Sequence, residues 1–168
     1  MRKTIKVISI VLISLISLLV IIYIIFQIKW NIESSKNISK LGPEAPLINL
    51  DGNSFRDLNK NGKLDVYEDT AINIDERIED LISQMSIEEK AGSMFITVIG
   101  INKDGSLSES PTFSNVFSFL FPSSSKMLVN LKMNHFNIMA THKKENMLKW
   151  YNNIQKIGER SRLGIPIT

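Results

Sequence analysis

The sequence contains no cysteine, which excludes disulfide bridges, thiolate metal sites and cysteine nucleophiles. It also lacks a cluster of lysines and arginines interleaved with aromatic residues, the pattern typical of a nucleic-acid-binding face. The formal net charge of +3 does not change this conclusion. Residues 1–30 hold four basic side chains and no acidic one, whereas residues 31–168 hold 16 basic and 17 acidic side chains. The basicity therefore belongs to the N-terminus, and we expect no nucleic-acid partner.

Several catalytic motifs are absent as well. The sequence has no G-x-S-x-G, H-E-x-x-H, P-loop or G-x-G-x-x-G pattern. His135 and His142 are expected to be structural or surface residues. Glycosidase chemistry needs two opposed carboxylates about 5–10 Å apart. The acids of residues 75–89 are expected on polar helix faces, and Asp104 and Glu109 lie in a serine-rich loop. We therefore assign no catalytic residue.

The N-terminus carries a long apolar run. From Val7 to Phe26, twenty residues contain no charge, proline or glycine. As a helix this run is roughly 30 Å long, the thickness of a bilayer hydrocarbon core. A cleaved signal peptide is the alternative, but its apolar part is normally about 7–15 residues and ends at small residues, and QIKWNIESS offers no such ending.

Residues 1–30 are therefore predicted to form a signal-anchor transmembrane helix whose partner is the lipid bilayer. Arg2, Lys3 and Lys6 precede the run and favour a cytoplasmic N-terminus. We expect a single-pass protein of the cell membrane with its C-terminal part outside the cytoplasm. Residues 31–54, polar at first and then punctuated by glycine and proline, are expected to be a spacer.

Residues 55–168 are predicted to form one α/β domain. Asn73 with Glu76 and Ser86 with Glu89 mark two helix starts, and Gly92 is expected to end the second helix. Residues 94–101 and 132–140 have the composition of strands. Residues 143–160 have helical periodicity, with an apolar stripe of Met147, Trp150, Tyr151, Ile154 and Ile157.

Ile165–Thr168 is typical of a third strand just starting, and strands alternating with a helix in this order predict a parallel sheet. Between the first two strands, residues 102–125 form a serine-rich loop. Its large apolar side chains are expected to pack against the domain: Phe113, Phe117, Phe119, Leu120 and Phe121.

Residues 57–68, DLNKNGKLDVYE, follow the calcium-loop pattern of an EF-hand. Alternating short oxygen side chains converge on one hard cation, a glycine at the sixth position allows the sharp turn, and a glutamate at the twelfth closes the shell. Prolines upstream forbid the usual entering helix, and there is no second loop. We predict a structural Ca²⁺ site; the alternative is a turn that binds nothing. The expected ligands are Asp57, Asn59, Asn61, Lys63 through its carbonyl, Asp65 and Glu68.

Four segments together resemble the opening of bacterial glycoside hydrolase family 3 enzymes, β-glucosidases among them. They are FRDLNKNGKLDVYED, DERIEDLISQMSIEEKAGSMF, NHF and LKWYNNIQKIGERSRLGIPIT. The S-x-E-E-K-x-G-x-M-F and R-L-G-I-P elements are the most specific, and the resemblance covers Phe55 to Thr168. In that family this stretch leads into and begins a (β/α)8-type barrel. The implied fold class is α/β: an N-terminal transmembrane helix followed by the opening part of an incomplete (β/α)8-type barrel.

The resemblance implies a retaining exo-glycosidase that hydrolyses O-glycosyl bonds of β-linked glucosides or related sugars. In the family the substrate-binding aspartate, the nucleophile and the acid/base follow R-L-G-I-P, whereas Thr168 is the last residue here. We therefore expect a fragment of a membrane-anchored glycoside hydrolase, truncated before the catalytic residues and inactive alone. A carbohydrate substrate is expected only for a full-length form. The alternative is a non-enzymatic, membrane-tethered calcium-binding or interaction module.

Overall fold

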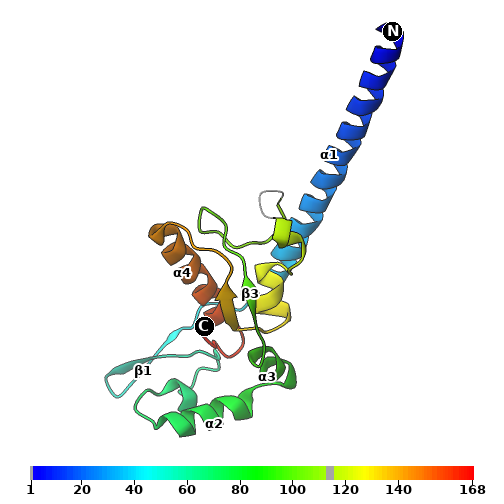
Figure 1. Cartoon of the computed structure of the whole chain (residues 1–168). Coiled ribbons are helices and arrows are strands. Elements are labelled where there is room, and N and C mark those ends of the chain that lie inside the picture. Colours follow the sequence, from blue (N-terminus) through cyan, green and yellow to red (C-terminus); the bar gives the residue numbers. More distant parts are fainter. Residues whose placement is uncertain (1, 113–115) are drawn as a thin grey trace.

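The computed structural model describes residues 2–112 and 116–168 and combines one long N-terminal helix with a mixed body of helices and strands (Figure 1). Helix α1, Arg2–Ile38, projects from the body for most of its length. Its apolar side chains from Ile5 to Ile28 are largely exposed. By length and composition, Lys3–Ile38 could cross a membrane, and its most apolar 18-residue window has a mean hydropathy of 3.1. The predicted apolar N-terminal helix is confirmed.

The last turns of α1 pack against the body. Asn37, 2% exposed, donates a hydrogen bond to Ser125 Oγ at 3.2 Å and accepts one from Asn130 Nδ2 at 2.7 Å. The range 31–54, predicted as a spacer, is thus helical as far as Ile38 and then enters a hairpin. Strands β1, Leu47–Leu50, and β2, Asn53–Arg56, are antiparallel. Their two-residue turn, Asp51-Gly52, has φ of 50° and 82°, as a tight hairpin turn requires.

The body contains a pair of parallel strands, as the sequence predicted. Strand β3, Ile96–Ile99, pairs with β4, His135–Ile138. Thr168 then bonds to the other side of β4: its N–H donates to Asn134 O, and Phe136 N–H donates to Thr168 O, both at 2.7 Å. These two bonds place Thr168 beside β4, where a third strand was predicted, but Ile165–Thr168 forms no strand of its own. The described residues form two two-stranded sheets and no barrel.

Helices α2, Ile74–Gln84, and α3, Ile87–Ser93, begin at the predicted caps. Asn73 caps α2 through the N–H of Asp75, and Ser86 forms the expected reciprocal capping box with Glu89. Gly92 lies inside α3 and does not end it, contrary to the prediction. A Cβ at Gly92 would lie 2.4 Å from the carbonyl oxygen of Lys132. The glycine is therefore explained by the close approach of a neighbouring segment.

Helix α4, Lys144–Arg160, covers the parallel strands and supplies much of the core. Three short helical turns complete the body: η1 at Val66–Glu68, η2 at Val116–Phe119 and η3, a π-helical turn, at Lys126–Asn130. Of the predicted α4 stripe, Tyr151 is 52% exposed and does not join the core. The buried apolar cluster comprises Ile99, Ile101, Met127, Leu128, Val129, Trp150, Ile154, Ile157 and Ile167.

The loop between β3 and β4 only partly follows the prediction. Phe119 is 50% exposed and Leu120 is 74% exposed, so these two side chains do not pack into the body as expected. Phe113 and the side chain of Phe117 lie outside the described residues. Phe119 lies close to α1, where it lines a hollow together with Leu19, Ile22 and Phe26.

Candidate functional site around the loop of residues 57–68

The first half of the loop is organised by short oxygen side chains that accept backbone N–H groups. Asp57, 1% exposed, accepts from Asn61 N–H at 3.1 Å through one carboxylate oxygen and from Gly62 N–H at 2.8 Å through the other. Asn59 Oδ1 also accepts from Asn61 N–H at 3.1 Å. Gly62 has φ of 78°, which agrees with the sharp turn that the sequence predicted.

The second half of the loop is closed by Glu68. This side chain, in a residue 6% exposed, accepts from Leu58 N–H at 2.6 Å and Asn59 N–H at 3.1 Å through Oε1, and from Asp65 N–H at 3.0 Å through Oε2. Asp65 Oδ2 in turn accepts from the side-chain amides of Asn59 at 2.7 Å and Asn61 at 2.6 Å. Five of the six predicted ligands are therefore connected in one hydrogen-bonded network. Their side-chain oxygens accept hydrogen bonds from N–H groups of the loop itself.

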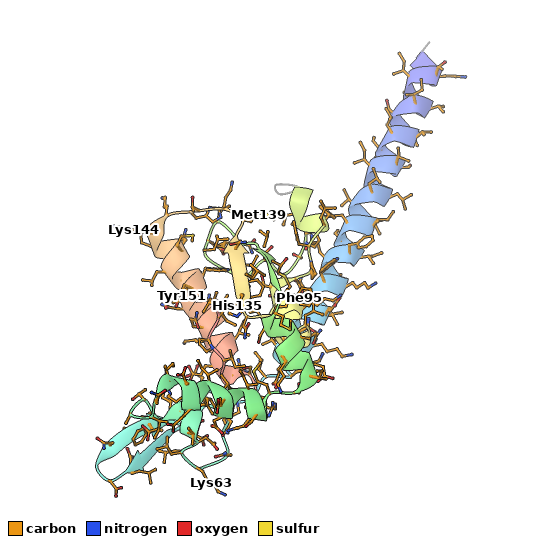
Figure 2. The ribbon with its side chains drawn as sticks, turned by 60° about the horizontal axis from the view of Figure 1, so that its bottom comes forward. Lys63, Phe95, His135, Met139, Lys144 and Tyr151 are labelled. Atoms are coloured by element: carbon orange, nitrogen blue, oxygen red, sulfur yellow. The ribbon has the colours of Figure 1, made fainter. Side chains whose placement is uncertain are left out.

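Lys63, the sixth predicted ligand, is exposed, and its side chain lies at the end of the body remote from the free part of α1 (Figure 2). Within residues 2–112 and 116–168, no group of three or more His, Cys, Asp or Glu side chains is placed to hold a metal ion. Carboxylate oxygens that accept one N–H keep further acceptor capacity. The loop thus contains the donor atoms a Ca²⁺ ion requires, and calcium binding stays a prediction.

A cation of the protein's own lies at the edge of the loop. Lys60 has φ of 60°, and its ammonium group donates to the carbonyl of Leu58, to Glu159 O at 2.5 Å and to Ser161 O at 2.6 Å. Burial lowers the pKa of Lys60, although the nearby carboxylates of Glu159 and Asp57 oppose this change. Because cations are stabilised at helix C-termini, this lysine ties the loop to the end of α4.

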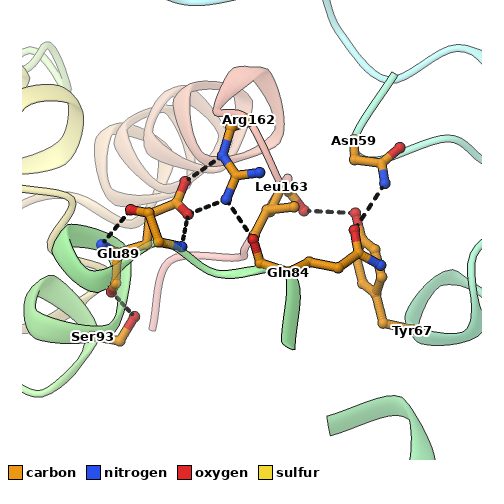
Figure 3. A network of polar contacts seen from close by, with 8 residues as sticks. Asn59, Tyr67, Gln84, Glu89, Ser93, Arg162 and Leu163 are labelled. Carbon is orange, nitrogen blue, oxygen red and sulfur yellow. Dashed lines mark hydrogen bonds and ion pairs between the residues drawn. The ribbon is translucent and has the colours of Figure 1, made fainter. Parts of the chain in front are cut away.

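A second polar contact joins α3 to the turn after α4 (Figure 3). Arg162 forms an ion pair with Glu89, and its Nε donates to Glu89 Oε1 at 3.1 Å. Nη2 of Arg162, the nitrogen that forms the ion pair, also donates to Gln84 O at 2.8 Å. Burial alone would raise the pKa of Glu89, but the bonds from Arg162 and from Ser86 N–H lower it overall. The hydrogen bonds and the charge of Glu89 raise the pKa of Arg162, against the effect of burial.

Tyr67 connects the loop to this contact. Its hydroxyl donates to Leu163 O at 3.2 Å, and the side chain is buried, in a residue 5% exposed. Burial and the neighbouring Glu68 raise the pKa of Tyr67, so the hydroxyl stays protonated and remains a donor. Asn59 Nδ2 also donates to Gln84 Oε1 at 3.2 Å, which links the loop to the end of α2 (Figure 3).

The four segments that carry the family resemblance are thereby brought together. Tyr67 from the first segment contacts Leu163 of the fourth, and Glu89 from the second contacts Arg162 of the fourth. In the third segment, Asn134 Nδ2 donates to Ser93 Oγ of the second at 3.1 Å. The segments that carry the family resemblance therefore contact one another and stabilise one arrangement of the body.

The other titratable residues named from the sequence have local partners. His142 Nε2 bonds to Ile101 O at 3.1 Å, and His135 Nδ1 contacts Thr168 Oγ1. Asp104 accepts from Ser106 N–H at 3.0 Å and Oγ–H at 2.7 Å, and these bonds lower its pKa. Glu109 accepts from Ser125 N–H at 3.0 Å and Oγ–H at 2.6 Å. Each of these four side chains therefore has a polar partner within the body.

Sequence reasoning missed Lys60 and Arg162 as organising residues. Their partners lie about one hundred or about seventy residues away along the chain, so no local spacing could reveal them. The only signal was indirect. Arg162 opens the R-L-G-I-P element and Glu89 belongs to the S-x-E-E-K element, the two most specific parts of the resemblance.

Comparison with known proteins relates the chain to β-glucosidases. No family model matches the chain. It is 36% identical over 111 residues to a probable β-glucosidase C of Aspergillus oryzae, a match that covers 65% of this chain and 16% of the relative. It is 34% identical over 129 residues to a periplasmic β-glucosidase/β-xylosidase of Dickeya chrysanthemi, covering 74% of this chain and 18% of that protein.

The matched stretch thus amounts to less than a fifth of each of these relatives. A β-glucosidase C of Emericella nidulans matches in the same way, at 34% identity over 106 residues. The chain is therefore homologous to one part of the β-glucosidases, and its resemblance to the N-terminal portion of glycoside hydrolase family 3 is confirmed.

Proposed function

We propose that the chain is the N-terminal segment of a membrane-anchored glycoside hydrolase of β-glucosidase type, and that residues 1–168 alone hydrolyse no glycoside. The homology to β-glucosidases carries this proposal. It is supported by the four segments that resemble glycoside hydrolase family 3. Their side chains make contacts within the body, such as the ion pair of Glu89 with Arg162. The carbohydrate substrate would then be met by the remainder of a full-length enzyme.

The parallel pair β3 and β4, followed by α4 and by the bonds of Thr168 to β4, supports the opening of a (β/α)8-type barrel. Such a barrel repeats strand and helix eight times, and its active site is assembled from the loops after several strands. A glycosidase also needs an acid and a nucleophile on opposite sides of the scissile bond. Two parallel strands supply no closed ring on which to hold that pair.

A chimera tests the family function directly. In the Dickeya chrysanthemi relative, the aligned segment is replaced by residues 55–168 of this chain, and hydrolysis of an aryl β-glucoside is measured. We expect activity, because the grafted segment supplies the same packing contacts. The matched control carries Arg162→Ala, which removes the contact to Glu89 and should lower the yield of active enzyme. A folded chimera without activity would contradict the proposal.

Inactivity of residues 1–168 is tested with the same aryl β-glucoside at high protein concentration over hours. We expect no turnover above buffer. Turnover that disappears in Asp104→Asn or Glu109→Gln would reveal a catalytic pair and overturn this part of the proposal.

Anchoring by α1 is tested by expressing the full chain in bacteria and washing the membranes with alkaline carbonate. We expect the chain to stay in the membrane pellet at its uncleaved mass, because twenty uncharged residues precede the first polar turn. The control inserts two charges with Leu15→Arg and Leu18→Arg, which should release the chain, since each arginine at mid-span costs about 2.5–3.5 kcal/mol. Recovery of a shortened chain in the soluble fraction would refute the anchor and favour a cleaved signal peptide.

A calcium-binding role of residues 57–68 is the second candidate, favoured by the convergence of Asp57, Asn59, Asn61, Asp65 and Glu68 on one loop. Millimolar Ca²⁺ should raise the melting temperature of the full chain, because an ion that binds only the folded state stabilises it by mass action. Mg²⁺ at the same concentration is the control ion. Asp65→Asn, which keeps the shape of the side chain and removes its charge, should reduce the calcium effect. An unchanged melting temperature in Ca²⁺ would refute the site.

A further inference from the structure

An uncharged stretch of the chain lies beside the apolar run of α1. Residues 110–125, SPTFSNVFSFLFPSSS, contain no Asp, Glu, Lys, Arg or His. In the described part of this stretch, Pro111 and Phe119 line an apolar hollow of about 590 Å³ together with Leu19, Ile22 and Phe26 of α1. Figure 1 shows η2, in yellow-green, against the lower half of this helix. The loop and the helix therefore share one apolar surface.

Polar contacts fix the loop and the body on α1. Gln27 Nε2, directly after the apolar run, donates to Pro111 O at 2.7 Å. Further along the helix, Glu33 lies 3.8 Å from Lys126, and Asn37 bonds to Ser125 and Asn130. These contacts are spread over roughly three turns of one helix, so the height of the loop along α1 is set by the fold.

The loop meets α1 near the end of the apolar run, which is Phe26. Leu19 and Ile22 precede Phe26 by seven and four residues, which is about 10 Å and 6 Å along a helix. If residues 7–26 fill the hydrocarbon core, both side chains lie below its outer surface. Phe119 lines the same hollow as Leu19 and Ile22. The loop cannot remain in water at that height while α1 crosses the bilayer.

The composition of the loop fits a lipid environment at this place. Leu120 is 74% exposed, and no charge occurs between Glu109 and Lys126 to oppose insertion. Tyr23 and Trp30, on the neighbouring turns of α1, are of the amphipathic aromatic type that gathers at the membrane–water interface.

We propose that residues 118–121 insert into the outer lipid leaflet beside α1, giving the body a second contact with the membrane. This inference rests on the proposed membrane anchoring and adds to it the orientation of the body. Two attachment points, the helix and the loop, prevent the body from swivelling freely about the helix axis. They hold the hairpin and the loop of residues 57–68 away from the bilayer (Figure 1).

The absence of cysteine makes the test direct, because a single introduced cysteine is the only thiol in the chain. Leu120→Cys in the full chain is labelled with an environment-sensitive nitrobenzoxadiazole dye and reconstituted into phosphatidylcholine vesicles. Ile16→Cys, within the apolar run, is the control for a bilayer position. Lys63→Cys, exposed at the remote end of the body, is the control for water. Quenching is measured with a nitroxide on the lipid chains and with aqueous iodide.

We expect the dye at position 120 to be quenched by the lipid-bound nitroxide and protected from iodide, as at position 16. The dye at position 63 should show the opposite pattern. If position 16 is quenched by lipid while position 120 behaves like position 63, the loop insertion is refuted and the anchor stands. If position 120 is shielded from both quenchers, protein covers the loop and the proposal is also overturned. If position 16 is itself open to iodide, the anchor fails and the insertion fails with it.

Discussion

Replacing Arg162 by alanine should destabilise the body, because the buried carboxylate of Glu89 then loses its ion-pair partner. The side chain of Glu89 is 10% exposed and that of Arg162 is 53% exposed. Without the guanidinium, the backbone N–H of Ser86 at 2.9 Å remains as a donor to Glu89. Hydrogen bonds to charged groups contribute about 1.5–3 kcal/mol. Because Arg162 is half exposed, water replaces part of the interaction that Glu89 loses. We therefore expect the free energy of unfolding to fall by about 1.5–2.5 kcal/mol.

The effect should depend on pH with a defined sign. The pKa of Glu89 is lowered in the folded chain. A carboxyl group with a lowered folded pKa stabilises the fold above its ordinary pKa of about 4.3, and this contribution is lost as the pH falls through the folded value. The difference between wild type and Arg162→Ala should therefore be largest near pH 7 and should shrink below about pH 4.

Thermal unfolding of the full chain in detergent micelles measures this effect, with tryptophan fluorescence as the signal because Trp150 is buried. For a body of this size we expect the melting temperature to fall by roughly 5–12 °C at pH 7. Lys156→Ala, an exposed position on α4 with the same change of charge, is the control and should have little effect. A melting temperature of Arg162→Ala equal to that of the control, or an equal fall at pH 3.5 and pH 7, would refute the reasoning.

Two further substitutions test the packing around the loop and α3. Gly92→Ala places a Cβ 2.4 Å from Lys132 O, and it should destabilise by about 1–3 kcal/mol, as overpacked positions do. Gly42→Ala, whose Cβ would meet its nearest atom at 3.5 Å, is the control in the same thermal assay, and equal melting temperatures would contradict the close approach. Lys60→Met keeps the length of the side chain but leaves the carbonyls of Leu58, Glu159 and Ser161 without their donor. We expect a loss of about 1–3 kcal/mol in urea unfolding, and wild-type stability would show that the lysine does not hold the loop to α4.

The elements with local signals were predicted well from the sequence. The reciprocal cap at Ser86 and Glu89 and the helix of residues 144–160 depend on spacings of three or four residues, which are visible in the sequence itself. The end of α1 was predicted wrongly, at residue 30 instead of Ile38. Its last turns are fixed by Asn37, whose partners Ser125 and Asn130 lie about ninety residues further along the chain.

In the candidate site, too, features with a local cause could be predicted and contacts between distant residues could not. The turn at Gly62 could be predicted because a positive φ is a local requirement. The contacts of Lys60 and Arg162 could not, since they form only after α4 has packed against the loop and α3. The exposure of Leu120 was missed for a related reason: an apolar residue was expected inside the domain, whereas the fold leaves it 74% exposed.

The position of β3 has a consequence for how these chains behave at high concentration. Within the described ranges, β4 is its neighbour on one edge, and no strand covers the other edge. Met94 and Phe95, directly before this strand, and Ile96, its first residue, are 83%, 62% and 70% exposed. Open backbone donors and acceptors beside apolar side chains are a template for strand addition from another molecule. Crowding these chains together therefore favours edge-to-edge aggregation, and dilution is the condition under which single copies persist.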